Sequence, residues 1–288
     1  MKAPEAPEAL EALKYSIKEL KEAGVPEAET EAEVIFKEIL GLDPASIFRD
    51  NPALTDKQKE KLKDTLLRRK KREPLQYIIG HVHFLDLKIL VGPGVLIPRP
   101  ETELVTLEAV KRISPLKGRP LKMVELCAGS GAISIALAKE FPEAEIMAVD
   151  ISEKALEYAR KNKDFNKVKN IVLLKGDLFE PVMGRKFHLI IANPPYIKDE
   201  ILEILEPEVR DWEPREALAG GPEGLEIVKK IIAQASDYLL NGGFLVLEIA
   251  GRTDPEVLYA LAREGGLAPE PVIKDYAGLE RIFVAKRP

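Results

Sequence analysis

Residues 193–196, with the sequence Asn-Pro-Pro-Tyr, combine groups that could hold a flat amino group. They follow the apolar run "FHLIIA", and Pro194 and Pro195 cannot donate to a sheet ladder, so a buried strand must end there. Asn193 offers a side-chain carbonyl and Pro194 a backbone carbonyl, and two acceptors suit the two hydrogens of a planar –NH2 group. The prolines stiffen the backbone that carries these acceptors, and Tyr196 offers a flat face for stacking. The four residues therefore predict a site that holds an amide or an aromatic amine in plane.

Amide and aromatic amine nitrogens are weak nucleophiles, because their lone pair is delocalised. Methyl transfer from a sulfonium to such a nitrogen gains from alignment, which can contribute about 7–11 kcal/mol. Taken alone, the same four residues also fit a proline-terminated strand without chemistry. The surrounding sequence has to distinguish the two interpretations.

A nucleoside site is indicated by the segment "VELCAGSGAISIALA", which predicts a strand, a glycine turn and a helix. Gly129 and Gly131 permit positive φ and the close approach of a ligand to the backbone. Asp150 follows Gly129 by 21 residues, at the predicted end of the next strand, where an acid can bind ribose hydroxyls. The dinucleotide fingerprint requires a glycine where this chain has Ser134. An adenosine without a pyrophosphate, such as that of S-adenosylmethionine, therefore fits better.

The third predicted strand ends in "GDLF". Asp177 could accept a hydrogen bond from the adenine amino group, and Leu178 could flank the ring. An ordinary turn at a strand end is the alternative for this pair.

Strand and helix patterns alternate from about residue 104 to the end of the chain. Apolar runs such as "LKMVELC", "AEIMAVD", "IVLLKGD" and "HLIIANP" predict buried parallel strands, with helical patterns between most of them. In such a sheet, ligands bind at the carboxyl ends of the strands, where the candidate residues fall. Before this domain we expect a helical domain over residues 1–74 and a β-hairpin linker over 75–92. Residues 93–288 are then the catalytic domain.

The chain resembles a known enzyme family in several segments. "NPPY", "VELCAGSGAI", "IMAVD" and "GDLF" are similar to motifs of the S-adenosylmethionine-dependent amino methyltransferases. "EPLQYIIGHVHF", "VGPGVLIPRPETELV", "WEPREALAGGPEGL" and "LVLEIAGRT" resemble the protein-(glutamine-N5) methyltransferases that modify peptide-chain release factors. The likeness extends from about residue 73 to the end of the chain.

This resemblance implies a Rossmann-like α/β domain whose seven-stranded sheet has an antiparallel last strand. It implies that Asn193 to Tyr196 hold the side-chain amide of the glutamine in a Gly-Gly-Gln loop. The loop from Pro98 to Glu103 would line the site, with Arg99 and Glu101 contacting the substrate. The residues implied to bind S-adenosylmethionine, which becomes S-adenosylhomocysteine, are Cys127, Ala128, Gly129, Ser130, Gly131, Asp150, Asp177, Leu178 and Asn193. The family usually has glycine where this chain has Cys127, which we interpret as a small buried hydrophobe rather than a catalytic thiol.

Composition narrows the class of protein further. The 288 residues are 45% hydrophobic and 32% charged, and no apolar run approaches the roughly 20 residues that span a membrane. We therefore expect a cytoplasmic protein and, as the simplest assembly, a monomer. One cysteine excludes an internal disulfide, and His81 with His83 would make a poor metal site, so we expect no metal.

Two other functions remain open at the level of sequence. An adenine-N6 methyltransferase acting on DNA or RNA would hold the same planar –NH2 group. A net charge of −5 and the acids in "PRPETE" and "IKDEILEILEPEVRDWEP" argue against a nucleic-acid substrate. The basic run over residues 57–72 fits either a solvated helix face or a surface for an acidic partner. A module that binds S-adenosylmethionine without transferring its methyl group is the non-enzymatic alternative.

Overall fold

The computed structural model describes residues 8–251 and 253–288. Its contacts divide the chain into two compact units. The N-terminal unit comprises the chain up to Gly80 together with Pro207–Trp212, and the sheet unit comprises His81–Glu206 and Glu213–Pro288. Residues 1–7 of the expected helical domain, and Arg252 in the segment "LVLEIAGRT", lie outside the described residues.

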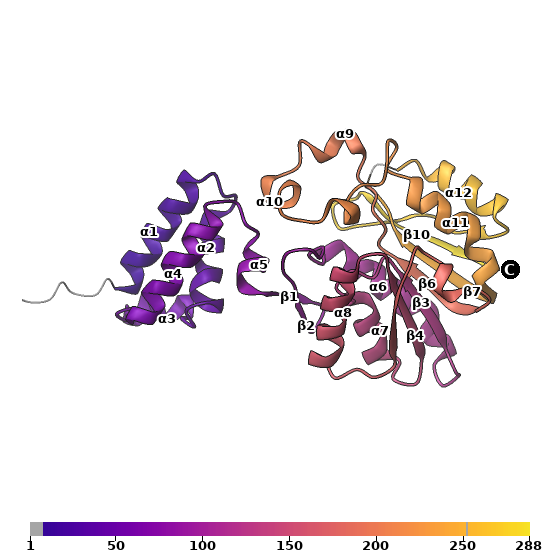
Figure 1. Cartoon of the computed structure of the whole chain (residues 1–288), viewed down its shortest axis with the longest axis horizontal. Helices are drawn as coiled ribbons and strands as arrows, with labels where there is room; N and C mark the ends of the chain where they lie inside the picture. Colours follow the sequence, from indigo (N-terminus) through magenta and orange to yellow (C-terminus); the bar gives the residue numbers. More distant parts are fainter. Residues whose placement is uncertain (1–7, 252) are drawn as a thin grey trace, which may run out of the picture. The chain divides into compact units, whose positions relative to one another are not determined.

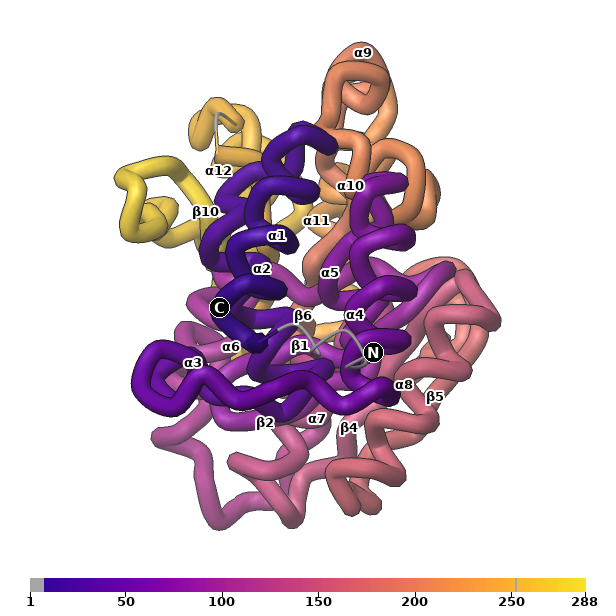
Figure 2. Tube along the Cα trace, turned by 90° about the vertical axis from the view of Figure 1, so that its left-hand side faces the viewer, coloured from indigo at the N-terminus to yellow at the C-terminus, as the bar shows by residue number. Residues whose placement is uncertain are grey.

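The N-terminal unit is a small helical bundle. Its helices are α1 (Ala9–Glu22), α2 (Ala28–Glu38), α3 (Pro44–Asp50), α4 (Asp56–Arg69), α5 (Leu75–Ile79) and the short α10 (Pro207–Arg210). Figures 1 and 2 both show α1 and α2 side by side, and their apolar faces enclose Leu13, Leu20, Ile35 and Phe36. Helix α4 begins at a capping box in which Thr55 and Gln58 satisfy each other's backbone amides. The segment thus folds as its periodicity predicts.

The expected hairpin over residues 75–92 is shorter in the structure. Residues Leu75–Ile79 form a helix instead of a strand, although Ile78 and Ile79 are β-branched. Pro74 occupies the N-cap position, and Gly80 ends the helix in a left-handed conformation with φ of 86°. Burial of Leu75 and Tyr77 outweighs the strand preference. The hairpin itself comprises β1 (His81–Phe84) and β2 (Leu87–Leu90), and it belongs to the sheet unit.

The sheet unit is built on a mostly parallel sheet. Its strands are β3 (Lys122–Leu126), β4 (Glu145–Asp150), β5 (Ile171–Lys175), β6 (Phe187–Ala192), β7 (Leu239–Glu248), β8 (Ala268–Pro269), β9 (Ile273–Lys274) and β10 (Glu280–Lys286). The order is β5-β4-β3-β6-β7-β10-β8, with β9 also paired to β10. Strand β10 runs antiparallel to β7. The Rossmann-like α/β class is confirmed, and the described sheet has one strand more than the expected seven because β8 and β9 are separate two-residue strands.

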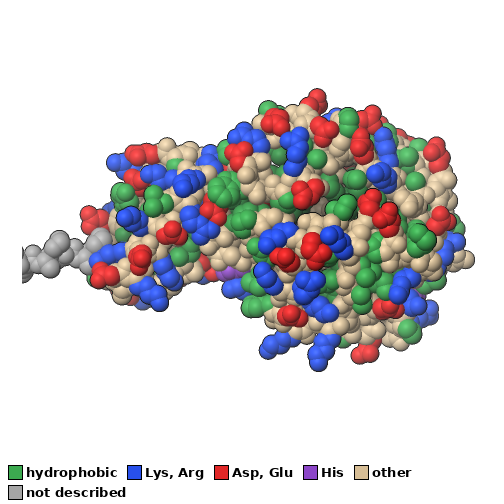
Figure 3. All heavy atoms as spheres, viewed as in Figure 1, with side chains coloured by type: hydrophobic (Ala, Val, Ile, Leu, Met, Phe, Trp, Pro, Cys, Tyr) green, Lys and Arg blue, Asp and Glu red, His purple; other side chains and the backbone are tan. Residues whose placement is uncertain are grey.

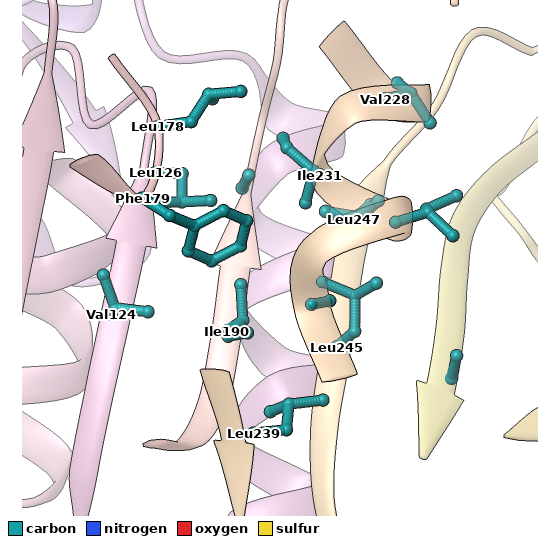
Figure 4. Packing of buried hydrophobic residues seen from close by; sticks show 14 of the residues in the cluster. Val124, Leu126, Leu178, Phe179, Ile190, Val228, Ile231, Leu239, Leu245 and Leu247 are labelled. Atoms are coloured by element: carbon teal, nitrogen blue, oxygen red, sulfur yellow. The ribbon is translucent and has the colours of Figure 1, made fainter. Parts of the chain in front are cut away.

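Helices cover both faces of this sheet, as Figure 1 shows. One layer contains α6 (Pro100–Ile113), α7 (Ala132–Glu140) and α8 (Glu153–Phe165), and the other contains α11 (Glu226–Tyr238) and α12 (Pro255–Glu264). The short elements are α9 (Asp199–Leu202) and the 3-10 turns η1 (Ser114–Leu116), η2 (Glu180–Val182) and η3 (Arg215–Ala217). Figure 4 shows strand residues such as Val124, Ile190 and Leu245 packed toward Ile231 of α11. Because both faces of the central strands are buried, their sequences are nearly continuous apolar runs.

None of the described helices combines the length and the apolar character needed to cross a lipid bilayer.

Candidate active site

The glycine turn after β3 provides one wall of a pocket in the sheet unit. Gly129 has a φ of 55° and Gly131 a φ of 77°, which glycine adopts without the strain that a Cβ introduces. A Cβ on Gly131 would lie 3.2 Å from the Cβ of Ala159 in α8, so this glycine also permits close helix packing. A Cβ on Gly129 would meet no atom within 4 Å, because this residue faces the open pocket.

Asp150 lies in the same pocket, at the end of β4. Its Oδ2 accepts a hydrogen bond from the backbone N–H of Gly129 at 2.7 Å, and its Oδ1 accepts one from Ser152 at 2.8 Å. A carboxylate can accept about four hydrogen bonds, so capacity remains for two hydroxyl groups. Burial raises the pKa of Asp150, while the backbone hydrogen bonds oppose that rise by stabilising the charged form.

Asp177 and Leu178 follow the end of β5, and both line the pocket. Leu178 is buried and has a φ of 46°, a conformation that its side chain disfavours. The pocket also has a set of apolar lining residues to which the sequence analysis gave no role. They include Val95, Leu96, Ile151, Ala217, Ala219 and Ile227. The two carboxylates, which accept hydrogen bonds, and the apolar side chains fit the ribose and adenine of S-adenosylmethionine.

Residues Asn193 to Tyr196 follow β6, which pairs with β3 in the sheet. Asn193 and Pro195 line the pocket. The chain then forms a parallel bridge between Ile197 and Ala219. A Cβ on Gly220 would lie 2.7 Å from the Cα of Tyr196, so only glycine allows this close approach. The "LAGG" part of the segment "WEPREALAGGPEGL" thus positions the backbone of the tetrad.

Two hydrogen bonds hold the polar side chains of the tetrad. Asn193 donates from Nδ2 to Oγ1 of Thr102 at 3.0 Å. The hydroxyl of Tyr196 donates to Oε1 of Glu248 at 2.9 Å. Burial raises the pKa of Tyr196 well above its usual range, and the nearby Glu248 carboxylate adds to this effect. Tyr196 therefore stays neutral at neutral pH.

Several residues expected in the site do not line this pocket. Pro100 begins α6, so the expected loop from Pro98 to Glu103 ends in the first turn of a helix. Arg99 donates to Glu213 at 2.6 Å, and Glu101 lies in the first turn of α6. The other expected residues outside the pocket lining are Ala128, Ser130, Gly131, Pro194 and Tyr196.

Cys127 lines the pocket and has a φ of 56°. Burial raises the pKa of its thiol, and the carboxylates of Asp150, Glu125 and Asp177 raise it further. A thiol that resists ionisation is a poor nucleophile. This electrostatic setting favours the interpretation of Cys127 as a small hydrophobic residue.

Glu248 is a residue beside the site to which the sequence assigned no role, whereas Thr102 falls within the expected loop from Pro98 to Glu103 without a role of its own. Glu248 is the one charged side chain in the apolar run "FLVLEIA", which is a signal that could have been noticed. For Thr102 the signal was its place in the segment "PRPETE", which did not indicate its hydrogen-bond partners. Among the described residues, no group of three or more His, Cys, Asp or Glu side chains could hold a metal ion.

Comparison with known proteins first gives the class. Residues 110–205 match the family model described as the methyltransferase small domain. The crystal structure of a methyltransferase from Pyrococcus furiosus is similar in fold, with a TM-score of 0.51 and 20% identity, covering 81% of this chain and 99% of that chain. Together with the pocket at the carboxyl ends of the strands, this defines an S-adenosylmethionine-dependent methyltransferase of the Rossmann-like class.

The remaining matches give the family. Residues 11–80 match the model of the PrmC N-terminal domain. The release factor glutamine methyltransferase of Thermodesulfovibrio yellowstonii is 41% identical over 257 residues, covering 89% of this chain and 92% of that protein. The protein of the same name from Moorella thermoacetica is 36% identical and covers 96% of this chain and 98% of that protein. The chain belongs to the release factor glutamine methyltransferase family.

Proposed function

We propose that this chain transfers a methyl group from S-adenosylmethionine to the side-chain amide N5 of a glutamine, in the Gly-Gly-Gln loop of a class I peptide-chain release factor. The observation that carries this proposal is the similarity to release factor glutamine methyltransferases across 89% of the chain. It includes both compact units, so it concerns the whole enzyme and not the nucleoside-binding fold alone.

The pocket residues support a division of roles. We assign the ribose hydroxyls to Asp150, the adenine to Asp177 and Leu178, and the methionine end to the turn from Cys127 to Gly131. S-adenosylmethionine supplies an electrophilic methyl group on its sulfonium, so that the C–N bond forms as the C–S bond breaks and the amide nitrogen releases one proton.

The chain's own contribution to catalysis is alignment. In the proposed complex, Oδ1 of Asn193 and the backbone carbonyl of Pro194 accept the two N–H groups of the glutamine amide, and Tyr196 packs against its plane. Pro195 stiffens the turn that carries these groups. Holding a weak nucleophile in line with the methyl group lowers the barrier by avoiding the entropy loss of a free encounter.

Charge around the site favours a protein substrate over a nucleic acid. Asp199 and Glu200 are exposed in the segment that follows the tetrad, where they would repel phosphates. Lys and Arg are interspersed with Asp and Glu on the face drawn in Figure 3. In the basic run over residues 57–72, a group of side chains forms ion pairs with carboxylates of the N-terminal unit. These are Lys59, Arg68, Arg69, Lys70 and Arg72.

The test is incubation with radiolabelled S-adenosylmethionine and each candidate acceptor. We expect labelling of a bacterial-type release factor and none when its Gly-Gly-Gln glutamine is replaced by glutamate, because a carboxylate has no nitrogen to methylate. Asn193→Ala is the control enzyme and should lower turnover more than cofactor affinity. Labelling of duplex DNA or ribosomal RNA, with the release factor unlabelled, would establish the adenine alternative instead.

A further inference from the structure

A buried carboxylate lies beside the tetrad and outside the pocket lining. Glu248, near the end of β7, is fully buried. Its Oε2 accepts a hydrogen bond from Oγ1 of Thr102 at 2.6 Å, and its Oε1 accepts one from the hydroxyl of Tyr196 at 2.9 Å. A buried charge is costly unless it is hydrogen-bonded. Here both oxygens are engaged, by residues that come from α6 and from the loop after β6.

The hydroxyl of Thr102 connects this carboxylate to Asn193. A threonine hydroxyl has a single proton to donate and can also accept. An ionised carboxylate can only accept, so the proton of Thr102 is committed to Glu248. Thr102 can then only accept from Asn193, which fixes the Nδ2 side of the Asn193 amide toward Thr102, as the 3.0 Å contact requires.

The orientation of the Asn193 amide decides what the substrate meets. With Nδ2 held by Thr102, Oδ1 lies on the other side of the amide group and is available as an acceptor. Among the described residues, no hydrogen bond to this oxygen is present, and Asn193 lines the pocket. A reversed amide would present N–H donors to the N–H donors of the target, and that contact is repulsive.

We propose that Glu248 is a positioning residue that acts through Thr102 to set the orientation of the Asn193 amide, so that an acceptor faces the target –NH2 group. This inference rests on the proposed function, because it requires an –NH2 group as the target. Through its second oxygen, the same carboxylate also anchors Tyr196. Glu248 therefore holds the residues at both ends of the tetrad, Asn193 through Thr102 and Tyr196 directly.

The direct test compares Thr102→Val with Thr102→Ser. Valine keeps the shape but removes the hydroxyl, so the amide of Asn193 can rotate. We expect kcat to fall about tenfold or more, on the scale of a lost oriented hydrogen bond at a reacting group. The dissociation constant of S-adenosylmethionine should change less than about twofold, since Thr102 does not line its pocket. Serine restores the hydroxyl and should restore most of kcat.

Thr106→Val is the matched control. Thr106 is fully buried, lies one turn further along α6, and donates only to the backbone carbonyl of Thr102 at 2.9 Å. Its substitution removes from the same helix a buried hydroxyl that has no hydrogen bond to Asn193 or Glu248 among the described residues, so kcat should persist. An equal loss of kcat in Thr106→Val and Thr102→Val would show a structural effect on α6 and would overturn the proposal.

A double-variant cycle tests the role of Glu248. If Glu248 acts through Thr102, Glu248→Gln should lower kcat in the wild-type background and add little to Thr102→Val, because the amide oxygen of glutamine can still accept the hydrogen bond from Tyr196. If the fold-losses in kcat of the two single variants multiply in the double variant, the two residues act independently, which contradicts the proposal. If Thr102→Val does not fold, Thr102→Ala, which also removes the hydroxyl, replaces it in the same comparison.

Turnover assays of the wild-type enzyme distinguish a failure of this proposal from a failure of the proposed function. Turnover with the release factor and an unchanged kcat in Thr102→Val would refute the positioning role alone. Turnover with an adenine acceptor would refute the proposed substrate. The variants would then be compared on that acceptor, since adenine presents the same –NH2 group.

Discussion

Asp150 links the glycine turn to the nucleoside, since its carboxylate accepts hydrogen bonds from the backbone of Gly129 and Ser152. We expect Asp150→Ala to weaken binding of S-adenosylmethionine by about 1–3 kcal/mol, the scale of hydrogen bonds to a charged group. Calorimetric titration measures this change, and Asp164→Ala on the exposed face of α8 is the control. An unaltered dissociation constant in a folded Asp150 variant would assign the ribose contact to another residue.

Glu248 should make turnover depend on pH. Burial raises its pKa above the ordinary value of 4.5, and hydrogen bonds from Thr102 and Tyr196 and the charge of Arg281 oppose the rise, while Glu101 adds to it. Positioning requires the ionised form, so kcat should be full above the pKa of Glu248 and fall as pH decreases through it. Because that pKa is raised, the loss should begin at a higher pH than for an ordinary glutamate.

The measurement is a profile of kcat against pH at saturating S-adenosylmethionine, which removes any contribution from cofactor binding. Glu248→Gln cannot ionise at this position, so its profile should lack that acid limb. Identical limbs in the two enzymes would assign the titration to another group.

At the scale of elements, the start of α7 depends on a glycine that serves two purposes. Gly131 has a φ of 77°, and a Cβ there would lie 3.2 Å from the Cβ of Ala159 in α8. Gly131→Ala should therefore incur about 1–2 kcal/mol for the left-handed backbone and roughly 1–3 kcal/mol for overpacking.

Gly118→Ala isolates the first of these two terms. Gly118 also has a positive φ, of 92°, but a Cβ there would meet no atom within 4 Å. Chemical denaturation of both variants gives the two free energies of unfolding. Equal losses would mean that α7 and α8 relax to accept the extra methyl group.

At the scale of the whole chain, a short segment belongs to a unit far from it in sequence. Pro207–Trp212 is flanked on both sides by residues of the sheet unit, yet it packs as part of the N-terminal unit. Glu208 accepts hydrogen bonds from Arg69 at 2.7 Å and from Arg72 at 2.6 Å. Burial opposes ionisation of Glu208, but these hydrogen bonds lower its pKa overall.

Glu208→Gln should destabilise the N-terminal unit by about 1.5–3 kcal/mol, because the negative charge and one of the two oxygens that accept from the arginines are lost. Since the folded pKa of Glu208 is lowered, its contribution is present above the unfolded pKa and is lost as pH falls through the folded pKa. Thermal melting at neutral pH measures the effect, with Asp211→Asn as the control, since Asp211 pairs with Arg210 in an exposed setting. A loss of stability no larger than in the control would mean that Glu31 alone is sufficient to balance the charge of Arg69.

Local and periodic features made much of this protein predictable. The apolar runs specify buried parallel strands, and chain direction then brings Gly129, Asp150, Asp177 and Asn193 to one edge of the sheet. The helices of the first unit follow from the spacing of their apolar residues in the same way. These predictions succeeded because each depends on a few neighbouring residues and on a rule of topology.

Tertiary packing decided what lay beyond such rules. The helix over Leu75–Ile79 replaced an expected strand, because burial of Leu75 and Tyr77 between Pro74 and Gly80 outweighs β-propensity. The contact between Asn193 and Thr102 joins residues 91 apart, and that between Thr102 and Glu248 joins residues 146 apart. Sequence determined which groups stand at the strand ends. Only the packing of α6 against β6 and β7 determined which of their atoms face one another, because hydrogen-bond partners are set by distance in space and leave no periodic trace in the chain.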